Sequence, residues 1–361
     1  GGGSEVALIE LINALPEELY NITLVLLDSD NEYAYRLKKN VNIVQLTFNS
    51  SFAKSLVSMY AFPAKVLKKL SVNSFIAYYD FISNCVTNVF EKTYDIAIDF
   101  YGYGSFVTAF LATKIQAKKK ATWLHDEKPY WMKSVQKYLC EYDKIYGVSQ
   151  AVVDAFCREY PHYKDKAAVF YNVIDIEEIK RKSEQDEIIP FKESFNIVTV
   201  GRLTEQKGYD IAIKAASILK KRKINFAWYA IGGGRDEKKL KKLVEKYCLE
   251  NQFVFLGRKK NPYPYMKHCD LYVQPSRHEG YVITLVEARA LCLPILSSDI
   301  PSAREQIQDG INGYVAELSA EDLADKIEYL YNNPSQRKKT VEYLKEHPID
   351  FSTELLKLEI I

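Results

Sequence analysis

Short apolar runs alternate with longer amphipathic stretches along most of the chain. The runs are typical of buried strands, and the stretches between them carry the apolar periodicity of helices. The predicted strands are Ile22–Leu27, Asn42–Leu46, Asp95–Phe100, Ala121–His125, Lys144–Val148, Ala167–Tyr171, Asn196–Val200, Phe226–Ile231, Phe253–Leu256, Leu271–Gln274 and Ile295–Ser298. The helices predicted between them include Phe106–Lys114, Ala151–Tyr160, Tyr209–Lys221, Glu237–Cys248 and Ile283–Leu291. This alternation predicts an α/β fold with doubly wound parallel sheets.

Chain length and one charged segment predict two domains. A chain of 361 residues is too long for a single typical core. The segment KRKSEQDEIIPFKE, Lys180–Glu193, is charged, lacks apolar periodicity and contains Pro190, as expected of a linker. We therefore predict domains at 1–185 and 193–345, followed by a closing helix at 346–361.

The chain opens with GGGSEVALIELINAL, a glycine-rich loop followed by an amphipathic helix. A loop of this kind normally follows a strand, and no strand precedes it here. We expect that the first strand of the N-terminal domain, typically about 5–6 residues, is missing from this chain. An added GGGS linker is the alternative interpretation.

The composition is that of an ordinary globular protein. Apolar residues make up 47% and charged residues 27%, and the formal net charge of +2 gives no reason to expect a nucleic-acid partner. The six cysteines form no C-x-x-C pair, which favours packed, reduced thiols in a cytosolic protein. The five histidines show no metal-ligand spacing. No apolar run reaches the about 18 residues of a membrane span, and no signal peptide is visible.

Two acids stand in the otherwise apolar stretch RHEGYVITLVEARALCLPILSS. Glu279 lies in a loop beyond a predicted strand, and Glu287 lies inside the helix that follows. Gly280 allows the backbone to approach a ligand closely, and the helix that begins near Val282 points free N–H groups at the same place. These features predict a diphosphate site, because ligands bind beyond the carboxyl ends of parallel strands.

A buried carboxylate needs a partner, and a sugar hydroxyl is a suitable one because it donates a hydrogen bond and stays neutral. The alternative is that Glu279 is an exposed loop acid and that Glu287 pairs with Arg289 or another base.

The loop in GRLTEQKGYDIAI holds two cations beyond another predicted strand. Arg202 and Lys207 follow Gly201, and two fixed cations at such a strand end suit a diphosphate leaving group. Basic residues are also common in surface loops, which is the alternative.

Three further stretches contain residues of functional interest. Gly232–Gly234 in AIGGGRDEKKL suit a loop against a nucleotide, but the third glycine of a dinucleotide fingerprint is missing. His125 and Asp126 in ATWLHDEKPYW follow a strand, so His125 could contact a sugar or acceptor or simply cap the strand end. The D-x-D triplet Asp28–Asp30 reads as a turn rather than as a metal–diphosphate motif.

Together these stretches resemble the retaining glycosyltransferases of family 4, of the bacterial surface-polysaccharide type. The resemblance is strongest from Phe195 to Val315 and includes FLGRKKNPYPYMKHCDLYVQPS and SSDIPSAREQIQDGINGYV. The opening GGGSEVALIELINALPEELYNITLVLLD is similar to the family's first glycine loop and helix. The resemblance implies the GT-B fold, two Rossmann-like domains that face a cleft, with the acceptor on the N-terminal domain and the donor mainly on the C-terminal one.

The resemblance also implies residue roles. Arg202 and Lys207 would grip the donor diphosphate, and Glu279 would bond hydroxyls of the donor sugar. Glu287 would bond the ribose hydroxyls, and His125 would lie near the sugar.

Backbone positions complete the implied donor site. N–H groups of Gly280, Tyr281 and Val282 would hold phosphate. The stretch around Gly257 and Arg258 would flank the base. The further glycines placed near the donor are Gly2, Gly3, Gly201 and Gly233.

The implied activity is metal-independent hexosyl or N-acetylhexosaminyl transfer with retention, without a cofactor. The donor is a nucleotide sugar, with a UDP-sugar favoured over a GDP-sugar, and the acceptor is a glycan or a polyprenyl- or lipid-linked sugar. Lysines beside apolar residues in Phe62–Phe75 suit contact with the inner face of the plasma membrane, and an amphipathic helix of the domain without membrane contact is the alternative. A sugar-nucleotide epimerase of the same fold and a non-catalytic nucleotide-sugar binding protein are the alternatives.

Overall fold

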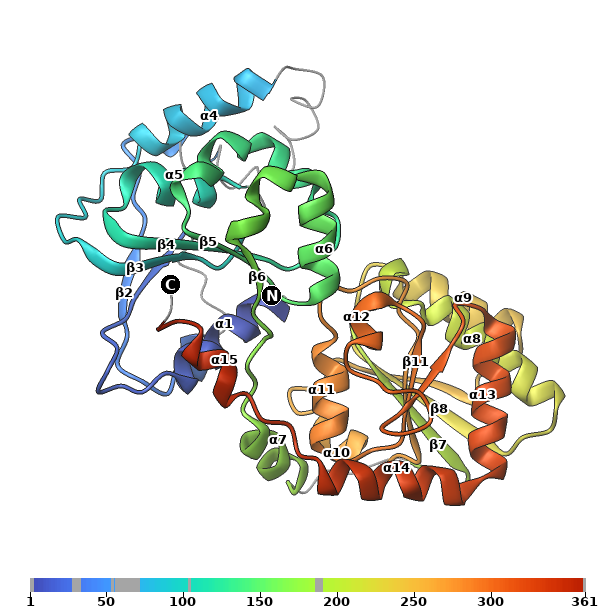
Figure 1. Ribbon diagram of the computed structural model, residues 1–361. Helices are drawn as coiled ribbons and strands as arrows, with labels where there is room; N and C mark the ends of the chain where they lie inside the picture. Colours follow the sequence, from blue (N-terminus) through green and yellow to red (C-terminus); the bar gives the residue numbers. More distant parts are fainter. Residues whose placement is uncertain are drawn as a thin grey trace. The chain divides into compact units, whose positions relative to one another are not determined.

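The structure, a computed structural model, describes residues 3–27, 34–52, 55, 72–102, 105–185 and 191–359 (Figure 1). The chain divides into two compact units, one of Gly1–Ile174 with Phe351–Ile361 and one of Asp175–Asp350. Each unit combines helices with parallel strands, which confirms the predicted α/β fold class. Gly2, the triplet Asp28–Asp30 and most of the segment Phe62–Phe75 lie outside the described residues.

The C-terminal unit is built on a six-stranded parallel sheet with the strand order β12-β11-β10-β7-β8-β9. Its strands are β7 (Phe195–Val200), β8 (Phe226–Ile231), β9 (Phe253–Gly257), β10 (Leu271–Gln274), β11 (Ile295–Ser298) and β12 (Tyr314–Ala316). Only β12 lacks a counterpart among the predicted strands. The direction of progression along the sheet reverses between β7 and β10, so the loops that leave these strands diverge at the switch point where such sheets bind ligands.

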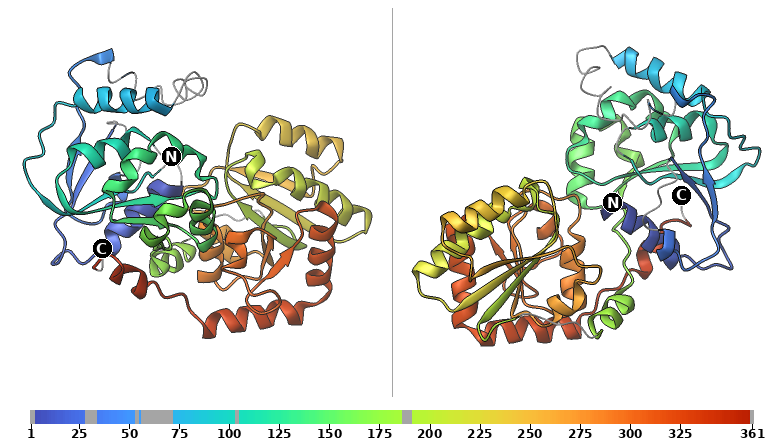
Figure 2. Two further views of the ribbon diagram at one scale, coloured as in Figure 1. Left: turned by 45° about the horizontal axis from the view of Figure 1, so that its top comes forward. Right: turned by 180° about the vertical axis from the view of Figure 1, so that it is seen from behind.

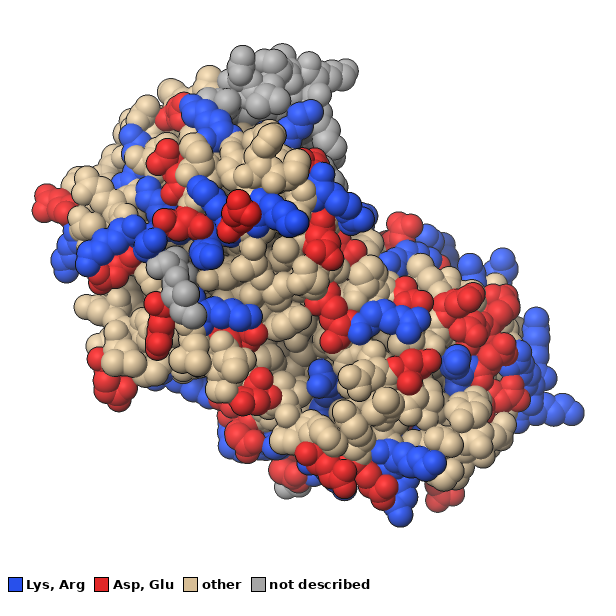
Figure 3. Space-filling model, viewed as in Figure 1, with Lys and Arg blue, Asp and Glu red and all other residues tan. Residues whose placement is uncertain are grey.

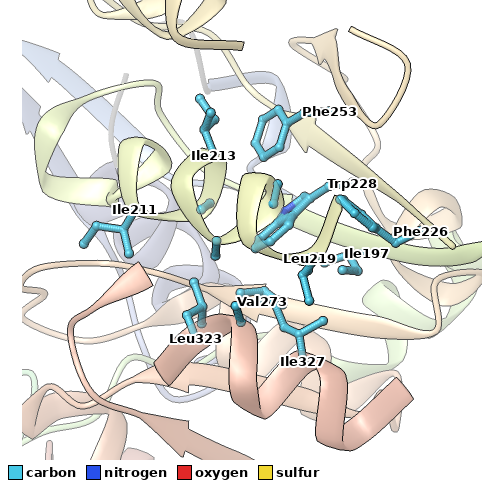
Figure 4. Close-up of a cluster of buried hydrophobic side chains, with 14 of the residues drawn as sticks. Ile197, Ile211, Ile213, Leu219, Phe226, Trp228, Phe253, Val273, Leu323 and Ile327 are labelled. Carbon is cyan, nitrogen blue, oxygen red and sulfur yellow. The ribbon is translucent and has the colours of Figure 1, made fainter. Parts of the chain in front are cut away.

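Helices cover both faces of this sheet, which makes it doubly wound (Figures 1 and 2). Ile197 and Trp228 pack with Leu323 on one face (Figure 4), whereas their neighbours Val198 and Tyr229 pack on the other. Successive residues of a strand point to opposite faces, so both must be apolar here. The helices are α8 (Tyr209–Lys221), α9 (Glu237–Lys246) and α13 (Ala320–Asn332) on the first face and α10 (Tyr263–Lys267), α11 (Ile283–Ala290) and α12 (Pro301–Arg304) on the second.

The division between the units falls before the predicted linker. α7, Ile176–Ser183, packs against α10 and α11 of the C-terminal unit. Asn261 Nδ2 also donates a hydrogen bond to the carbonyl oxygen of Lys182 at 2.8 Å. These contacts attach α7 to the second unit, so the units part at Ile174 rather than between 185 and 193.

The end of the chain returns to the N-terminal unit. After α14 (Pro334–Glu346), the chain reaches α15 (Ser352–Leu356). Glu354 Oε2 accepts a hydrogen bond from the Tyr171 N–H at 2.9 Å, and Lys357 Nζ donates one to the Val169 carbonyl at 3.0 Å. The closing segment that begins at Phe351 is therefore bonded to the chain around β6.

The N-terminal unit contains a two-stranded and a four-stranded parallel sheet. The strands are β1 (Thr23–Leu26) and β2 (Asn42–Gln45), and β3 (Tyr94–Asp99), β4 (Ala117–Leu124), β5 (Lys144–Gly147) and β6 (Ala167–Val169). The longer helices are α1 (Gly3–Ala14), α4 (Val72–Asn84), α5 (Phe106–Lys114) and α6 (Gln150–Glu159). Ser105 and Ser149 cap α5 and α6 by accepting hydrogen bonds from N–H groups in their first turns. The predicted missing first strand stays a prediction.

Charges are mixed on the surface. Basic and acidic side chains are interspersed on the face seen in Figure 3, as the small net charge of +2 leads us to expect. Within the described ranges, no helix is long and apolar enough to cross a membrane.

Candidate donor site of the C-terminal unit

Glycines shape the loop Gly201–Gly208 that follows β7. Gly208 has a φ of +67°, and a Cβ there would come within 1.8 Å of the Pro275 carbonyl oxygen, so only glycine fits. This close approach sets the loop after β7 against the loop after β10. The side chain of Lys207 passes 3.4 Å from the position of a Cβ on Gly201, so the lysine folds back over the end of its own strand.

Lys207 and Glu279 form an ion pair between these two loops. Lys207 Nζ lies 2.6 Å from Glu279 Oε1, and the two side chains are only 16% and 9% exposed. Glu279 is therefore a buried acid with a cationic partner and not an exposed loop acid. A charge so far removed from water requires such a partner.

Hydrogen bonds hold Glu279 at both its side chain and its backbone. Ser276 Oγ donates to Glu279 Oε1 at 2.7 Å, and Ser302 Oγ donates to the Glu279 carbonyl oxygen at 2.9 Å. Both serines are fully buried. The carboxylate is thus fixed by the fold and does not depend on Lys207 alone.

A second ion pair fastens the same two loops. Arg277 forms two bonds of 2.8 Å each to the carboxylate of Asp210, at the start of α8. Burial favours a raised pKa for Asp210, but the hydrogen bonds and charge of Arg277 outweigh it and hold this pKa below its usual range. The Arg277 N–H also donates to the Gln206 carbonyl at 2.8 Å. Planar bidentate pairs of this kind fix geometry as well as charge.

Arg258 and Leu203 flank the glycine loop after β8. A Cβ on Gly233 would lie 2.9 Å from Arg258 Nε, and a Cβ on Gly234 would lie 2.3 Å from the Leu203 carbonyl oxygen. The loop therefore packs closely on both neighbours. Arg202 is exposed, and its side chain makes no hydrogen bond or ion pair with the described residues.

The helix α11 begins directly beyond Glu279. Gly280 and Val282 are buried and Tyr281 is half-buried. Val282 occupies the N-cap position and provides no side-chain cap. The positive end of the helix therefore adjoins Glu279 without a capping side chain, which is favourable for an anion.

Glu287 lies inside α11 and accepts a hydrogen bond from the Tyr263 hydroxyl at 3.0 Å. Burial raises the pKa of the Tyr272 hydroxyl well above its usual range, and the charge of nearby Glu287 adds to this. In the described structure, Arg289 makes no ion pair with Glu287. The alternative based on that pair is therefore wrong.

A hollow of about 240 Å³ opens beside this site. Its lining residues come from α9, the start of α8 and the two loops, namely Thr204, Glu205, Asp210, Asp236, Lys239, Leu240, Lys242, Leu243, Lys246 and Arg277. Neither Lys207 nor Glu279 lines it. We therefore treat it as separate from the candidate donor site.

His125 and Gly3 belong to the N-terminal unit. His125 Nε2 donates a hydrogen bond to the Phe100 carbonyl oxygen at 2.7 Å, just beyond the end of β3. Burial lowers the pKa of His125 to about 4 despite this bond, so the ring is neutral at pH 7. The histidine thus does bond a strand end, and its predicted place near the sugar stays a prediction. Gly3 opens α1 and is exposed.

Sequence reasoning missed the side chains that support Glu279. Gln274 and Ser276 are both fully buried, and neither was considered. The available signal was their polarity at the end of a buried apolar strand, where a polar side chain requires a partner. The Arg277–Asp210 pair was missed because its members are far apart in the chain.

No group of three or more His, Cys, Asp or Glu residues could hold a metal ion in the part of the chain that the structure describes. The expectation of metal-independent chemistry stays a prediction. All six cysteines are free thiols, but only Cys85 and Cys269 are buried, so the predicted packing applies to a minority of them.

A protein family and several individual proteins are similar to parts of this chain. The family model for glycosyl transferases group 1 matches residues 180–347. An uncharacterised glycosyltransferase of Methanocaldococcus jannaschii is 33% identical over 172 residues, which are 46% of this chain and 40% of that protein. The N-acetylgalactosamine-N,N'-diacetylbacillosaminyl-diphospho-undecaprenol 4-alpha-N-acetylgalactosaminyltransferase of Campylobacter jejuni is 30% identical over 184 residues, 48% of this chain and 49% of that one. The chain spans about half the length of the curated relatives it matches.

A solved structure matches nearly the whole chain. HepE of Anabaena, crystallised in complex with UDP, superposes with a TM-score of 0.74 at 16% identity and covers 99% of this chain and 95% of its own. At this level of identity the likeness shows the fold alone, which is the two-unit GT-B fold predicted from the sequence.

Proposed function

Because this chain belongs to the glycosyl transferases of group 1 through its residues 180–347, we propose that it transfers a sugar from a nucleotide-sugar donor to a glycan or lipid-linked acceptor in surface-glycan synthesis. We favour a UDP-sugar donor, with a GDP-sugar as the alternative, and retention of configuration at the anomeric carbon. The observation that carries the proposal is the buried Lys207–Glu279 pair, which lies at the switch point of the sheet.

The donor diphosphate is proposed to lie between the exposed guanidinium of Arg202, the ammonium of Lys207 and the start of α11. Lys207 would then share its charge between the phosphate and Glu279. Glu279 would accept a hydroxyl of the donor sugar, and Glu287 would accept the ribose hydroxyls. A neutral hydroxyl donor suits a buried carboxylate, since it adds a hydrogen bond without adding a charge.

The chemistry requires no covalent bond between sugar and protein. The acceptor oxygen bonds to the anomeric carbon on the face from which the diphosphate departs, and the bond from that carbon to the phosphate oxygen breaks. The departing phosphate oxygen takes the acceptor's proton. Lys207 and Arg202 stabilise the charge that grows on the diphosphate, and the loops position the reactants.

The acceptor and the place of action are part of the same proposal. The Campylobacter jejuni relative has diphospho-undecaprenol in the name of its activity, and this supports a polyprenyl-linked acceptor. We therefore place the reaction at the inner face of the plasma membrane, without a metal ion or a cofactor.

Thermal unfolding of the wild-type protein against UDP-, GDP- and ADP-sugars tests the donor class. A ligand at 100 times its Kd stabilises the folded state by about 2.7 kcal/mol. We expect one nucleotide class to raise the unfolding temperature. The matching nucleoside monophosphate, which lacks the second phosphate, serves as the control and should raise it less.

Release of nucleoside diphosphate, measured with and without EDTA, then separates transfer from binding. We expect release that survives EDTA. Stabilisation without release in the presence of any glycan or lipid-linked acceptor would point to a binding protein. A complete lack of stabilisation by nucleotide sugars would reject the donor site, and loss of release in EDTA would reject metal independence.

A further inference from the structure

A buried chain of hydrogen bonds ends on Glu279. Gln274 Nε2 donates to Ser276 Oγ at 2.7 Å, and Ser276 Oγ donates to Glu279 Oε1 at 2.7 Å. Gln274 and Ser276 are both fully buried. Buried polar side chains with every partner in place fix a single local arrangement.

The direction of these bonds follows from the carboxylate of Glu279, which only accepts, so that Ser276 donates its one proton there and accepts from Gln274. The carbonyl oxygen of the Gln274 side chain accepts from the Tyr272 hydroxyl at 2.6 Å and from the Thr284 hydroxyl at 2.8 Å. Two hydroxyl donors on that oxygen turn the amide nitrogen toward Ser276. Ser276 accepts from this nitrogen, and its single proton is therefore directed to Glu279.

The carboxylate of Glu279 is consequently used unevenly. Ser276 donates a hydrogen bond to Oε1 at 2.7 Å, and Lys207 forms its ion pair with the same oxygen at 2.6 Å. Oε2 accepts no hydrogen bond from the residues that the structure describes. Two donors on one oxygen hold the plane of the carboxylate and leave the other oxygen as the acceptor for a ligand.

We propose that Gln274 and Ser276 are positioning residues that hold Glu279 so that Oε2 accepts a hydroxyl of the donor sugar. This inference rests on the proposed function. Under this proposal, one oxygen atom of Glu279, Oε2, sets the requirement for a hydroxyl on the sugar. A nucleotide sugar without that hydroxyl would leave Oε2 without a hydrogen bond. Sites built to accept a substrate hydroxyl discriminate strongly against analogues that lack it.

We call the hydrogen-bonded chain from Gln274 through Ser276 to Glu279 the relay. It matters most when the nucleotide-sugar donor is bound. A diphosphate near Lys207 would share the charge of that ammonium with Glu279, and the Ser276 hydroxyl is then the one donor committed to Oε1 alone. Loss of the relay should therefore affect the sugar part of the donor and leave the nucleoside diphosphate part unaffected.

Two substitutions interrupt the relay in different ways. Ser276→Ala removes the proton that Glu279 Oε1 receives. Gln274→Glu keeps the size of the side chain and can still accept from Tyr272 and Thr284, but its second oxygen takes the Ser276 proton away from Glu279. It thereby reverses the bond between residue 274 and Ser276 and removes the bond from Ser276 to Glu279, without leaving a cavity.

Two further variants serve as controls. Ser276→Thr keeps the hydroxyl and should therefore keep the activity that Ser276→Ala loses. Ser297→Ala removes an equally buried hydroxyl on the paired strand, where Ser297 faces Gln274 in the register and bonds only carbonyl oxygens. Ser297 has no contact with Glu279 in the described structure, so its loss reports the general effect of deleting a buried hydroxyl here.

The measurements are donor kcat/KM with UDP-glucose and UDP-N-acetylglucosamine and the Kd of UDP. We expect Ser276→Ala and Gln274→Glu to lower kcat/KM at least tenfold, mainly through kcat. The Kd of UDP should stay within twofold of the wild type. Ser276→Thr should stay within threefold in kcat/KM, and Ser297→Ala within twofold.

Equal losses of kcat/KM in Ser276→Ala and Ser297→Ala would overturn the relay. A loss of UDP affinity in Ser276→Ala that parallels its loss of kcat/KM would also overturn it, because such a loss indicates general damage to the site. If Ser276→Ala does not fold, unchanged kinetics in Gln274→Glu overturn the proposal and a tenfold loss supports it. A wild-type protein that releases no UDP from either sugar rejects the proposed function, and this inference with it.

Discussion

Two buried carboxylates at strand ends, Asp99 in the N-terminal unit and Glu279 in the C-terminal unit, have contrasting partners. Asp99 Oδ1 accepts the Gly102 N–H at 3.0 Å, and Oδ2 accepts the Thr108 and Thr122 hydroxyls at 2.6 and 3.1 Å. All these donors are neutral and occupy both oxygens. Glu279 instead has a lysine and a serine at Oε1, and Oε2 accepts no hydrogen bond from the described residues.

The difference teaches that burial alone does not identify a functional acid. Burial raises the pKa of Asp99 even though the Thr108 hydroxyl and the other donors oppose this, yet its bonds serve to join β3, β4 and α5. Glu279 has a lysine as its partner, and its Oε2 accepts no hydrogen bond from the described residues, so a ligand can bind there without breaking bonds that hold the fold together.

The largest expected effect is on turnover in Lys207→Ala and Arg202→Ala. Each should lower nucleoside diphosphate release at least tenfold, which corresponds to about 1.4 kcal/mol of transition-state stabilisation. Lys207→Ala should also lower the free energy of unfolding by roughly 1–3 kcal/mol, because Glu279 remains buried without its cation. Arg202→Ala should change that free energy by no more than about 0.5 kcal/mol, because Arg202 is exposed.

Turnover assays paired with urea unfolding test this separation. Lys238→Ala, an exposed lysine on α9, is the matched control and should alter neither quantity. Normal turnover in both Arg202→Ala and Lys207→Ala would remove the proposed phosphate clamp.

The next effect is on stability in Asp99→Asn. An amide offers one acceptor oxygen and brings two donors, so the Gly102, Thr108 and Thr122 bonds cannot all persist. The free energy of unfolding should fall by about 1–3 kcal/mol. The Kd of UDP should not change, since the proposed donor site lies in the other unit. A loss of UDP affinity measured by calorimetry would contradict the structural role given to Asp99.

The smallest expected effect concerns pH and His125. The pKa of His125 in the folded protein, about 4, lies below its ordinary value of 6.5. The unfolded chain therefore binds the proton more readily, and His125 contributes stability above pH 6.5 that is lost as the pH falls toward 4. His125→Gln keeps a donor for the Phe100 carbonyl but does not titrate. From pH 7 to pH 5 the wild type should lose roughly 1 kcal/mol more than this variant, after allowance for solvent screening.

Thermal or urea unfolding of both proteins at the two pH values provides the check. The opposite shift at Asp99 is common to both proteins and cancels in the comparison. Parallel pH profiles would show that His125 is not held neutral by burial.

The sequence predicted most of the C-terminal sheet because its strands are uninterrupted apolar runs that loops separate clearly. Strand β12 was not predicted, because Tyr314–Ala316 is short and lies beside polar residues. The boundary at Ile174 was not predicted either, since α7 is charged on its surface and resembles a linker until its packing on α10 and α11 is known.

The candidate site was predicted at the level of loops and not at the level of bonds. Lys207 and Glu279 could be predicted to lie together because parallel strands bring their carboxyl-end loops to one edge. The place of Arg202 in the site stays a prediction. The alternative pairing of Glu287 with its sequence neighbour Arg289 is wrong, however. Arg289 cannot meet Glu287, because residues two apart point to different sides of a helix. The Gln274–Ser276–Glu279 relay depends on side-chain positions that only the folded chain determines.

The most direct test of the central claim compares the wild type with Glu279→Gln. The two quantities measured are the rate of UDP release, from the UDP-sugar that the wild type uses fastest, and the Kd of UDP. We predict that Glu279→Gln releases UDP at least tenfold more slowly and binds UDP no more weakly than the wild type. The reason is that Lys207 loses its carboxylate partner and remains available to phosphate. Release at the wild-type rate, or UDP affinity lost in step with release, would contradict a sugar-binding role for this carboxylate.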